Sequence, residues 1–160
     1  MTFNSAPGSD SRPRVGPWVA YAAALWASVF AIFHIFWAAG WYPLLDAEQA
    51  RVAFATPWKW TYDVVVAGMC IIAVPVALAP VTSLGQHAPR RLIYTLAGIG
   101  TALLLLRSVA SLIQAGYLLL VGRFRLSDIG IWEPWFYLGA MLFSITTWRT
   151  RPWSHADRIT

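Results

Sequence analysis

The feature that most constrains this chain is the apolar run from Leu92 to Val121, which contains one charged residue, Arg107. The hydrocarbon core of a bilayer is about 30 Å thick, and about 20 helical residues cross it. The run therefore predicts a membrane-spanning helix that tilts or projects beyond the core. An arginine near the centre of a bilayer is costly, so Arg107 is expected to face protein or a wet cavity rather than acyl chains.

Helical periodicity places the polar residues of this run on one face. Arg107, Ser111 and Gln114 recur at spacings of three and four residues, whereas most of the leucines point elsewhere. That face is expected to look into the protein. Two interpretations of Arg107 remain open: it binds a ligand, or it fixes helix packing through carbonyl and hydroxyl groups.

Composition supports an integral membrane protein. Of 160 residues, 58% are hydrophobic and only 12% are charged, and 10 are tryptophan. The net charge of +5 comes from arginines that flank apolar runs. Topology and lipid headgroups account for such arginines better than nucleic acid does, so no nucleic-acid partner is expected.

Three further apolar runs complete an all-α, four-helix transmembrane bundle. The first is too long and too aromatic for a cleaved signal peptide, so we expect a retained anchor. The predicted spans are residues 17–39, 62–79, 92–121 and 132–148. They form one membrane domain, residues 17–149, between a disordered cytoplasmic tail (1–16) and a basic cytoplasmic tail (150–160).

Orientation follows from the basic residues that flank the spans. Seven lie on one side: Arg12, Arg14, Arg90, Arg91, Arg149, Arg151 and Arg158. Four lie on the other side: Arg51, Lys59, Arg123 and Arg125. Both termini are therefore expected in the cytoplasm of a multi-pass protein of the cell membrane, with Lys59 in the first outer loop.

Four polar side chains from three helices are predicted to converge in the outer half of the membrane, beneath Asp63 and Glu133. At 1.5 Å per residue, His34, Gln114 and Tyr137 lie about 6 Å below the outer boundary, and the Arg107 backbone lies about 16 Å below it. The arginine side chain can reach upward by about 6 Å. The candidate ligand-binding residues are His34, Trp37, Asp63, Arg107, Ser111, Gln114, Glu133 and Tyr137.

Each acid of this set opens a predicted helix, where the helix dipole favours an anion and where Glu133 would also cap the chain before Pro134. His34 lies in a stripe of alanines that allows close helix contact. It is either a neutral packing residue that shares a hydrogen bond or a group that handles protons or ligand. No catalytic residue is assigned.

Several cofactors are disfavoured. Only His34 of the three histidines lies in a span, so one chain cannot ligate a haem through two histidines. No cluster has the ligands of a zinc site, and Cys70 is the only cysteine, which excludes an intrachain disulfide. We therefore expect neither a metal nor a cofactor.

Short motifs resemble the signature of small bacterial four-span membrane proteins that are grouped as a domain of unknown function. They are His34-Ile35-Phe36-Trp37 followed by Gly40-Trp41, Arg107 in the third span, and Trp132-Glu133-Pro134-Trp135 opening the fourth. The resemblance covers nearly the whole chain after Gly16. It implies the four-span fold and no particular activity.

Three functions fit this pattern. The first is binding or movement of a small amphiphile in a pocket open to the outer leaflet, with His34 or Arg107 at its headgroup and tryptophans along its tail. The second is a membrane enzyme for a lipid or isoprenoid substrate, with His34, Asp63 or Glu133 as acid or base. The third is an accessory subunit. Membrane lipids are the expected partners, and a homodimer stays open.

Overall fold

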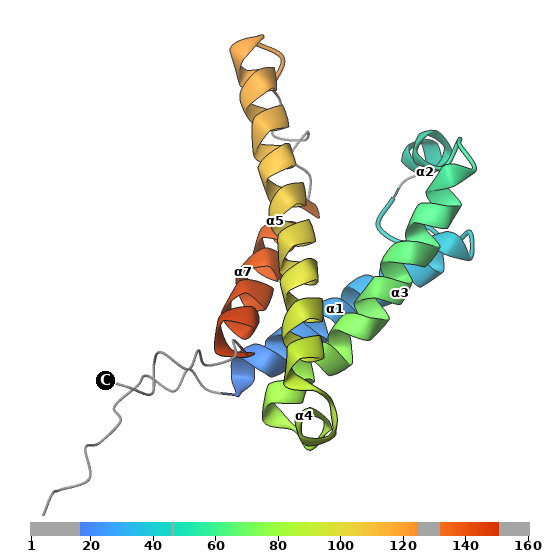
Figure 1. Cartoon of the computed structure of the whole chain (residues 1–160). Helices are drawn as coiled ribbons and strands as arrows, with labels where there is room; N and C mark the ends of the chain where they lie inside the picture. The colour runs from blue at the N-terminus through green and yellow to red at the C-terminus, as the bar shows by residue number, and fades with distance from the viewer. Residues whose placement is uncertain (1–16, 46, 125–131, 151–160) are drawn as a thin grey trace, which may run out of the picture.

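The computed structural model describes residues 17–45, 47–124 and 132–150, which form helices and their connections without a strand (Figure 1). The helices are α1 (Trp18–Ala38), α2 (Ala47–Ala53), α3 (Trp58–Leu78), the 3₁₀ turn η1 (Ala79–Val81), α4 (Leu84–His87), α5 (Arg90–Leu120) and α7 (Trp132–Thr150). The all-α prediction is confirmed for these residues. The two predicted tails, residues 1–16 and all but the first residue of 150–160, lie outside them.

Three of these helices are long and apolar enough to cross a membrane: Trp18–Ala38, Trp58–Val81 and Arg90–Leu120. The chain is therefore a multi-pass membrane protein by the length and composition of its helices. The fourth predicted span forms α7, a helix of 19 residues. It is less apolar than the other three, since Glu133 and Pro134 stand in its first turn and hydroxyl side chains occupy its second half.

The helix bounds differ from the predicted spans mainly at α3, which begins at Trp58 rather than at residue 62. Pro57 precedes it with φ at −57°, the angle that starts a helix without strain. As a result Lys59 lies in the first turn of α3, and the prediction of a loop lysine is wrong. Helices α1 and α5 agree with the bounds of the first and third predicted spans within two residues.

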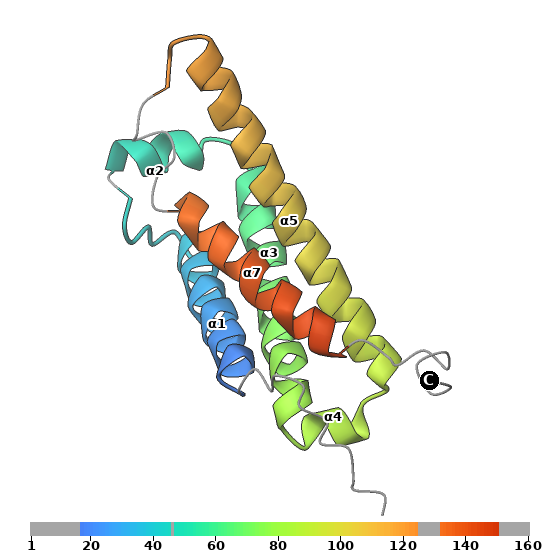
Figure 2. The same ribbon diagram turned by 90° about the vertical axis from the view of Figure 1, so that its left-hand side faces the viewer.

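The long helices run antiparallel in succession and form two pairs. Helix α1 packs along α3, and α5 packs along α7, while α1 also contacts α7 (Figure 2). The α1–α3 pair and the α5–α7 pair approach each other near α4 and diverge toward α2 (Figure 1). Helix α5 also extends well past the start of α7 (Figure 2).

The core lies where α1 meets α7 and α3. Small residues of α1, including Ala23, Ala27 and Ala31, are buried as their spacing predicted. Trp26 donates from Nε1 to the carbonyl oxygen of Trp135 over 3.0 Å. Its ring lies on Gly139, where an added Cβ would approach Trp26 Cζ2 to 2.4 Å. This glycine therefore allows the close contact between the two helix pairs.

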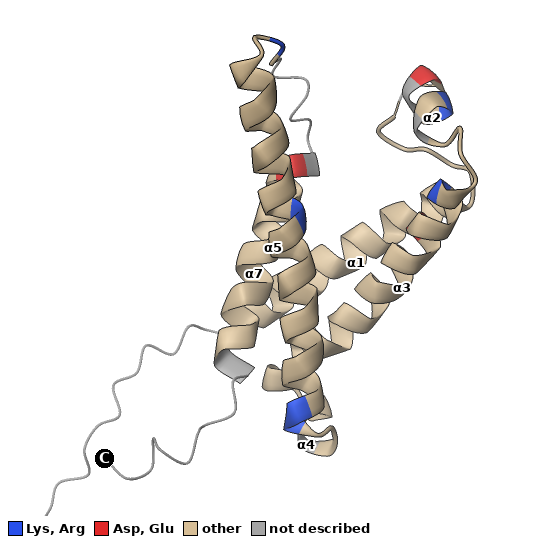
Figure 3. Ribbon diagram, turned by 45° about the horizontal axis from the view of Figure 1, so that its top comes forward, with Lys and Arg blue, Asp and Glu red and all other residues tan. Residues whose placement is uncertain are grey.

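Charged residues lie mainly at the two ends of the long helices, with long uncharged stretches between them (Figure 3). Helix α2 carries the exposed ion pair Glu48–Arg51, with 2.6 Å between Oε1 and Nη2. The start of α1 and the end of α7 lie at the opposite end, beside α4 (Figure 2).

Candidate functional site

His34 and Asp63 join α1 to α3. His34 lies near the end of α1 and Asp63 near the start of α3. Because the two helices pack antiparallel, the two side chains lie at the same height along the helix axes. His34 Nδ1 and Asp63 Oδ1 are 2.7 Å apart, and the two side chains are 4% and 3% exposed. The first acid of the predicted set therefore pairs with the histidine of the neighbouring helix.

The second polar atom of each partner is buried without a hydrogen bond in the described part of the chain: His34 Nε2 and Asp63 Oδ2. With Asp63 as a carboxylate, the Nδ1 hydrogen is donated to it, and neutral His34 presents Nε2 as an acceptor. Aromatic rings surround the imidazole, with centroid distances of 4.6 Å to Phe30, 5.0 Å to Trp37 and 6.0 Å to Tyr62. Two acceptors thus lie in a largely apolar setting.

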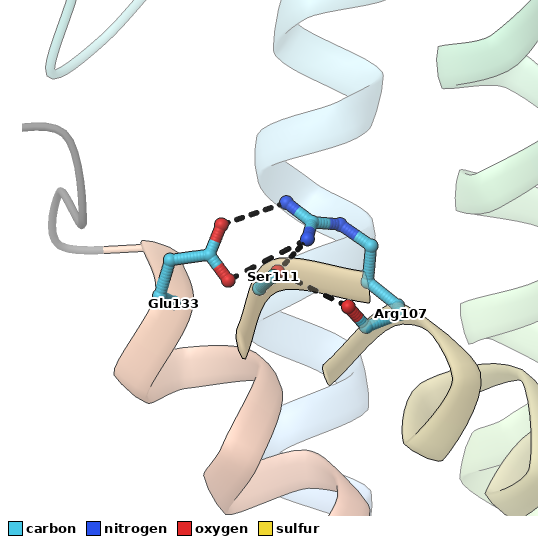
Figure 4. A network of polar contacts seen from close by, with 3 residues as sticks. All are labelled: Arg107, Ser111 and Glu133. Atoms are coloured by element: carbon cyan, nitrogen blue, oxygen red, sulfur yellow. Dashed lines mark hydrogen bonds and ion pairs between the residues drawn. The ribbon is translucent and has the colours of Figure 1, made fainter. Parts of the chain in front are cut away.

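Arg107 joins α5 to α7 (Figure 4). Its Nη2 donates to Glu133 Oε1 over 2.8 Å, and its Nη1 lies 3.5 Å from Oε2. Nη1 also donates to the Ser111 hydroxyl, which in turn donates to the Arg107 carbonyl oxygen over 3.1 Å. The second acid of the predicted set therefore also pairs with a base across a helix interface.

One edge of the Arg107 guanidinium has no hydrogen-bond acceptor among the described residues. Glu133 and Ser111 occupy Nη1 and one hydrogen of Nη2, so Nε and the second Nη2 hydrogen have no acceptor among the described residues. The Arg107 side chain is 41% exposed, against 17% for Glu133. Its Cζ lies 4.7 Å from the ring centroid of Phe136. The arginine thus presents a two-donor edge, which matches a carboxylate or phosphate.

Two adjoining cavities of about 340 Å³ each meet at this arginine. The polar compartment is lined by Phe30, His34, Trp37, Leu45, Phe54, Lys59, Tyr62, Asp63, Arg107 and Phe136. The apolar compartment lies between the two helix pairs and is lined by side chains that include Trp26, Met69, Leu103 and Phe143. Phe30, Tyr62, Arg107 and Phe136 line both cavities.

The structure brings six of the eight predicted site residues into this region. His34, Trp37, Asp63 and Arg107 line the polar compartment, and Ser111 and Glu133 hold Arg107. Gln114 and Tyr137 line neither cavity: Gln114 is exposed, and Tyr137 is half-buried on α7. The predicted convergence of those two side chains with His34 therefore does not occur.

The physical reason is the unequal length of α5 and α7. The depth comparison assumed that the two helices end at one level, but α5 extends past the start of α7 (Figure 2). Glu133 therefore lies beside Arg107 rather than above it. Gln114 lies about two turns farther along the projecting end, because each turn rises by about 5.4 Å.

Six residues that line the polar compartment were not among the predicted set: Phe30, Leu45, Phe54, Lys59, Tyr62 and Phe136. Phe30 precedes His34 by four residues, and Phe136 follows Glu133 by three, so each shares a helix face with a predicted residue. Those spacings could have identified both. Lys59 could have been found from Pro57, since a proline at a helix start would have moved that start to include the lysine.

The described residues hold no group of three or more His, Cys, Asp or Glu side chains that could bind a metal ion. What the arrangement can do is bind a polar head. It offers paired donors on Arg107, a cation on Lys59 and an acceptor on His34, next to a cavity with apolar walls. No family model, curated protein or solved structure matches this chain.

Proposed function

We propose that this chain is a four-span protein of the cell membrane, with both termini in the cytoplasm, that binds or moves an amphiphile in a pocket open to the outer leaflet. The polar compartment takes the head and the apolar compartment takes the tail. The observation that carries this proposal is the shared wall of the two cavities: Arg107 lines both, one of them together with His34, Lys59 and Asp63 and the other together with mainly apolar side chains.

The position of α7 supports the fourth crossing. Its 19 residues amount to about 28 Å of helix, close to the thickness of a hydrocarbon core. It runs antiparallel to α5 and ends beside α4, at the end of the molecule where α1 starts (Figure 2). Four crossings return the chain to the side from which it began, and the seven basic flanking residues favour the cytoplasm for that side.

The divergence of the helix pairs supports lateral entry. Helices α3 and α5 separate toward α2 (Figure 1), and the apolar compartment lies between them. In a bilayer this opening would face acyl chains, so a tail could enter sideways while its head stays near α2. A soluble ligand would need no such apolar extension.

Arg107 is better suited to ligand binding than to packing alone. A packing arginine in a membrane is expected to have its donors satisfied by protein. Here a two-donor edge lacks an acceptor among the described residues, and the side chain is more exposed than its partner Glu133. An anionic head on that edge would complete its hydrogen bonds.

The test is lipid that co-purifies with the protein, identified and quantified by native mass spectrometry. Leu103→Trp would fill the apolar compartment, and Leu105→Trp is the matched control, since Leu105 is similarly exposed (46% against 44%) but does not line the cavity. We expect retained lipid to fall at least fivefold in Leu103→Trp only. Equal retention in both variants and the wild type would refute the proposal, and absence of lipid from all three would favour the accessory subunit.

The enzyme alternative has one specific observation in its favour. A histidine that is paired with a carboxylate through one nitrogen and lines a cavity is the arrangement of a general base. Turnover of a supplied lipid or isoprenoid that disappears in His34→Ala would support it. Binding of the same compound without turnover would support the binding protein instead.

A further inference from the structure

We propose that the head of the ligand carries a hydrogen-bond donor for His34 in addition to an anion for Arg107. The ligand class is then an anionic amphiphile whose head bears a hydroxyl a few bonds from its phosphate or carboxylate. This inference rests on the proposed function and narrows its ligand. It is drawn from the unpaired atoms at the two ends of the polar compartment.

At the α1–α3 end, the unpaired atoms are acceptors. Asp63 takes the Nδ1 hydrogen of His34, which leaves His34 Nε2 and Asp63 Oδ2 buried without a donor among the described residues. The nearby Tyr62, Lys59 and Arg107 line the same cavity but make no hydrogen bond to either atom. Leaving a buried acceptor without a donor is unfavourable. A ligand hydroxyl at Nε2 would supply the missing hydrogen.

At the α5–α7 end, the unpaired groups are donors. The free edge of Arg107 offers two N–H groups in the fork that receives two oxygens of an anion. Lys59 adds a cation from α3: its ammonium lies 4.5 Å from the ring centroid of Trp58, and no described carboxylate forms an ion pair with it. This end therefore favours the charged part of the head.

The floor between the two ends consists of two aromatic rings. The Phe136 ring lies 4.7 Å from Arg107 Cζ and 5.3 Å from the Phe30 ring, which lies 4.6 Å from the His34 ring. An anion on Arg107 therefore cannot also be the group that reaches His34 unless the head extends over these rings. A head with a hydroxyl a few bonds from its anion would place its intervening carbon atoms on these apolar faces.

The test compares two synthetic lipids with the same acyl chain and the same phosphate. One is 1-acylglycerol 3-phosphate, which has a hydroxyl on its second carbon, and the other is its 2-deoxy analogue. Dissociation constants are measured by isothermal titration to the purified full-length protein in one detergent. We expect the deoxy lipid to bind about tenfold more weakly, because one hydrogen bond to a buried acceptor is lost.

The matched variant replaces both partners, His34→Leu with Asp63→Leu, because an apolar pair avoids leaving one buried charge alone. It should bind the two lipids equally. The control Thr146→Val removes another buried polar group, which donates to the carbonyl oxygen of Leu142 within α7, and should keep the tenfold preference. The wild-type comparison does not depend on the folding of any variant.

Each result has a separate meaning. Equal affinity of the two lipids for the wild type would overturn this inference and leave the proposed function intact. Glycerol 3-phosphate binding as tightly as the acylated lipid would point to a soluble anion and overturn both. If neither lipid binds, and lipid retention is unchanged in Leu103→Trp, both the inference and the proposed function would be overturned.

Discussion

The two helix pairs are each joined by one acid and one base, but the two joints differ in burial. His34–Asp63 joins α1 to α3 and is almost fully buried, whereas Arg107–Glu133 joins α5 to α7 with an arginine side chain that is 41% exposed. A buried pair is expected to contribute mainly to the stability of the contact between its two helices. A half-exposed pair keeps donors free for a ligand. Both pairs contribute side chains to the lining of the polar compartment, so they differ in how strongly each is expected to hold its helices together and not in whether it faces the cavity.

The largest loss of stability is expected when one partner of the buried His34–Asp63 pair is removed. His34→Leu leaves Asp63 buried without its hydrogen-bond donor, which should lower the free energy of unfolding by about 3–5 kcal/mol. Adding Asp63→Leu should restore most of that loss, because two apolar side chains need no partner. Thermal unfolding in detergent measures both. If His34→Leu alone were as stable as the wild type, the buried pair would not be what holds α1 to α3.

The second-largest loss of stability is expected at the contact between the two helix pairs, where Gly139 packs against Trp26. Gly139→Ala would place a Cβ 2.4 Å from Trp26 Cζ2, and that ring is held by its bond to Trp135. We expect a loss of about 1–3 kcal/mol in the free energy of unfolding from the forced shift. Gly116→Ala is the control, since a Cβ there meets nothing within 4 Å. Equal melting temperatures for the two variants would contradict the close contact.

The half-exposed joint should affect binding more than stability. Arg107→Lys keeps the charge but loses the two-donor edge, so affinity for an anionic amphiphile should fall about tenfold. The free energy of unfolding should change by about 1 kcal/mol or less, as expected of a partly solvated pair. Isothermal titration and thermal unfolding of one preparation give both values. A large loss of stability with unchanged affinity would assign Arg107 to packing.

Much of the fold was predictable because apolar length decides which segments cross a membrane. The bounds of α1 and α5 followed from their hydropathy, and the alanines of α1 correctly marked its buried face. The angle between the helix pairs was not predictable. It depends on where Gly139 admits Trp26 and on which residues fill the space between α3 and α5, and neither follows from the periodicity of one helix.

The site was predictable by residue type but not by pairing. The predicted spans place both Asp63 and Glu133 at helix starts, where a dipole or a cap explains an acid without any partner. Glu133 does lie in the first turn of α7, but α3 begins at Trp58, so Asp63 lies in its second turn. Their actual partners lie on neighbouring helices, 29 and 26 residues away in sequence. Antiparallel packing of α1 on α3 would have suggested the first pair. The second required knowing that α5 extends past α7.

A third acid–base pair is largely exposed, and its loss should change the stability of the protein least. Glu48 and Arg51 lie on α2 with side chains 68% and 72% exposed. The hydrogen bond from Arg51 lowers the pKa of Glu48, so its contribution is present above the unfolded pKa and is lost as pH falls through the lower, folded pKa. Any gain from this pair is therefore confined to pH values above that acidic range.

Glu48→Gln tests this smallest effect. Water and salt screen such a pair, so the variant should melt at the wild-type temperature at neutral pH. Amide hydrogen exchange of residues 47–53 should be slightly faster than in the wild type at neutral pH and low salt. The difference should vanish in acid and at high salt. A loss of stability comparable to that of His34→Leu would mean that burial does not determine how much each of the three acid–base pairs contributes to the stability of the fold.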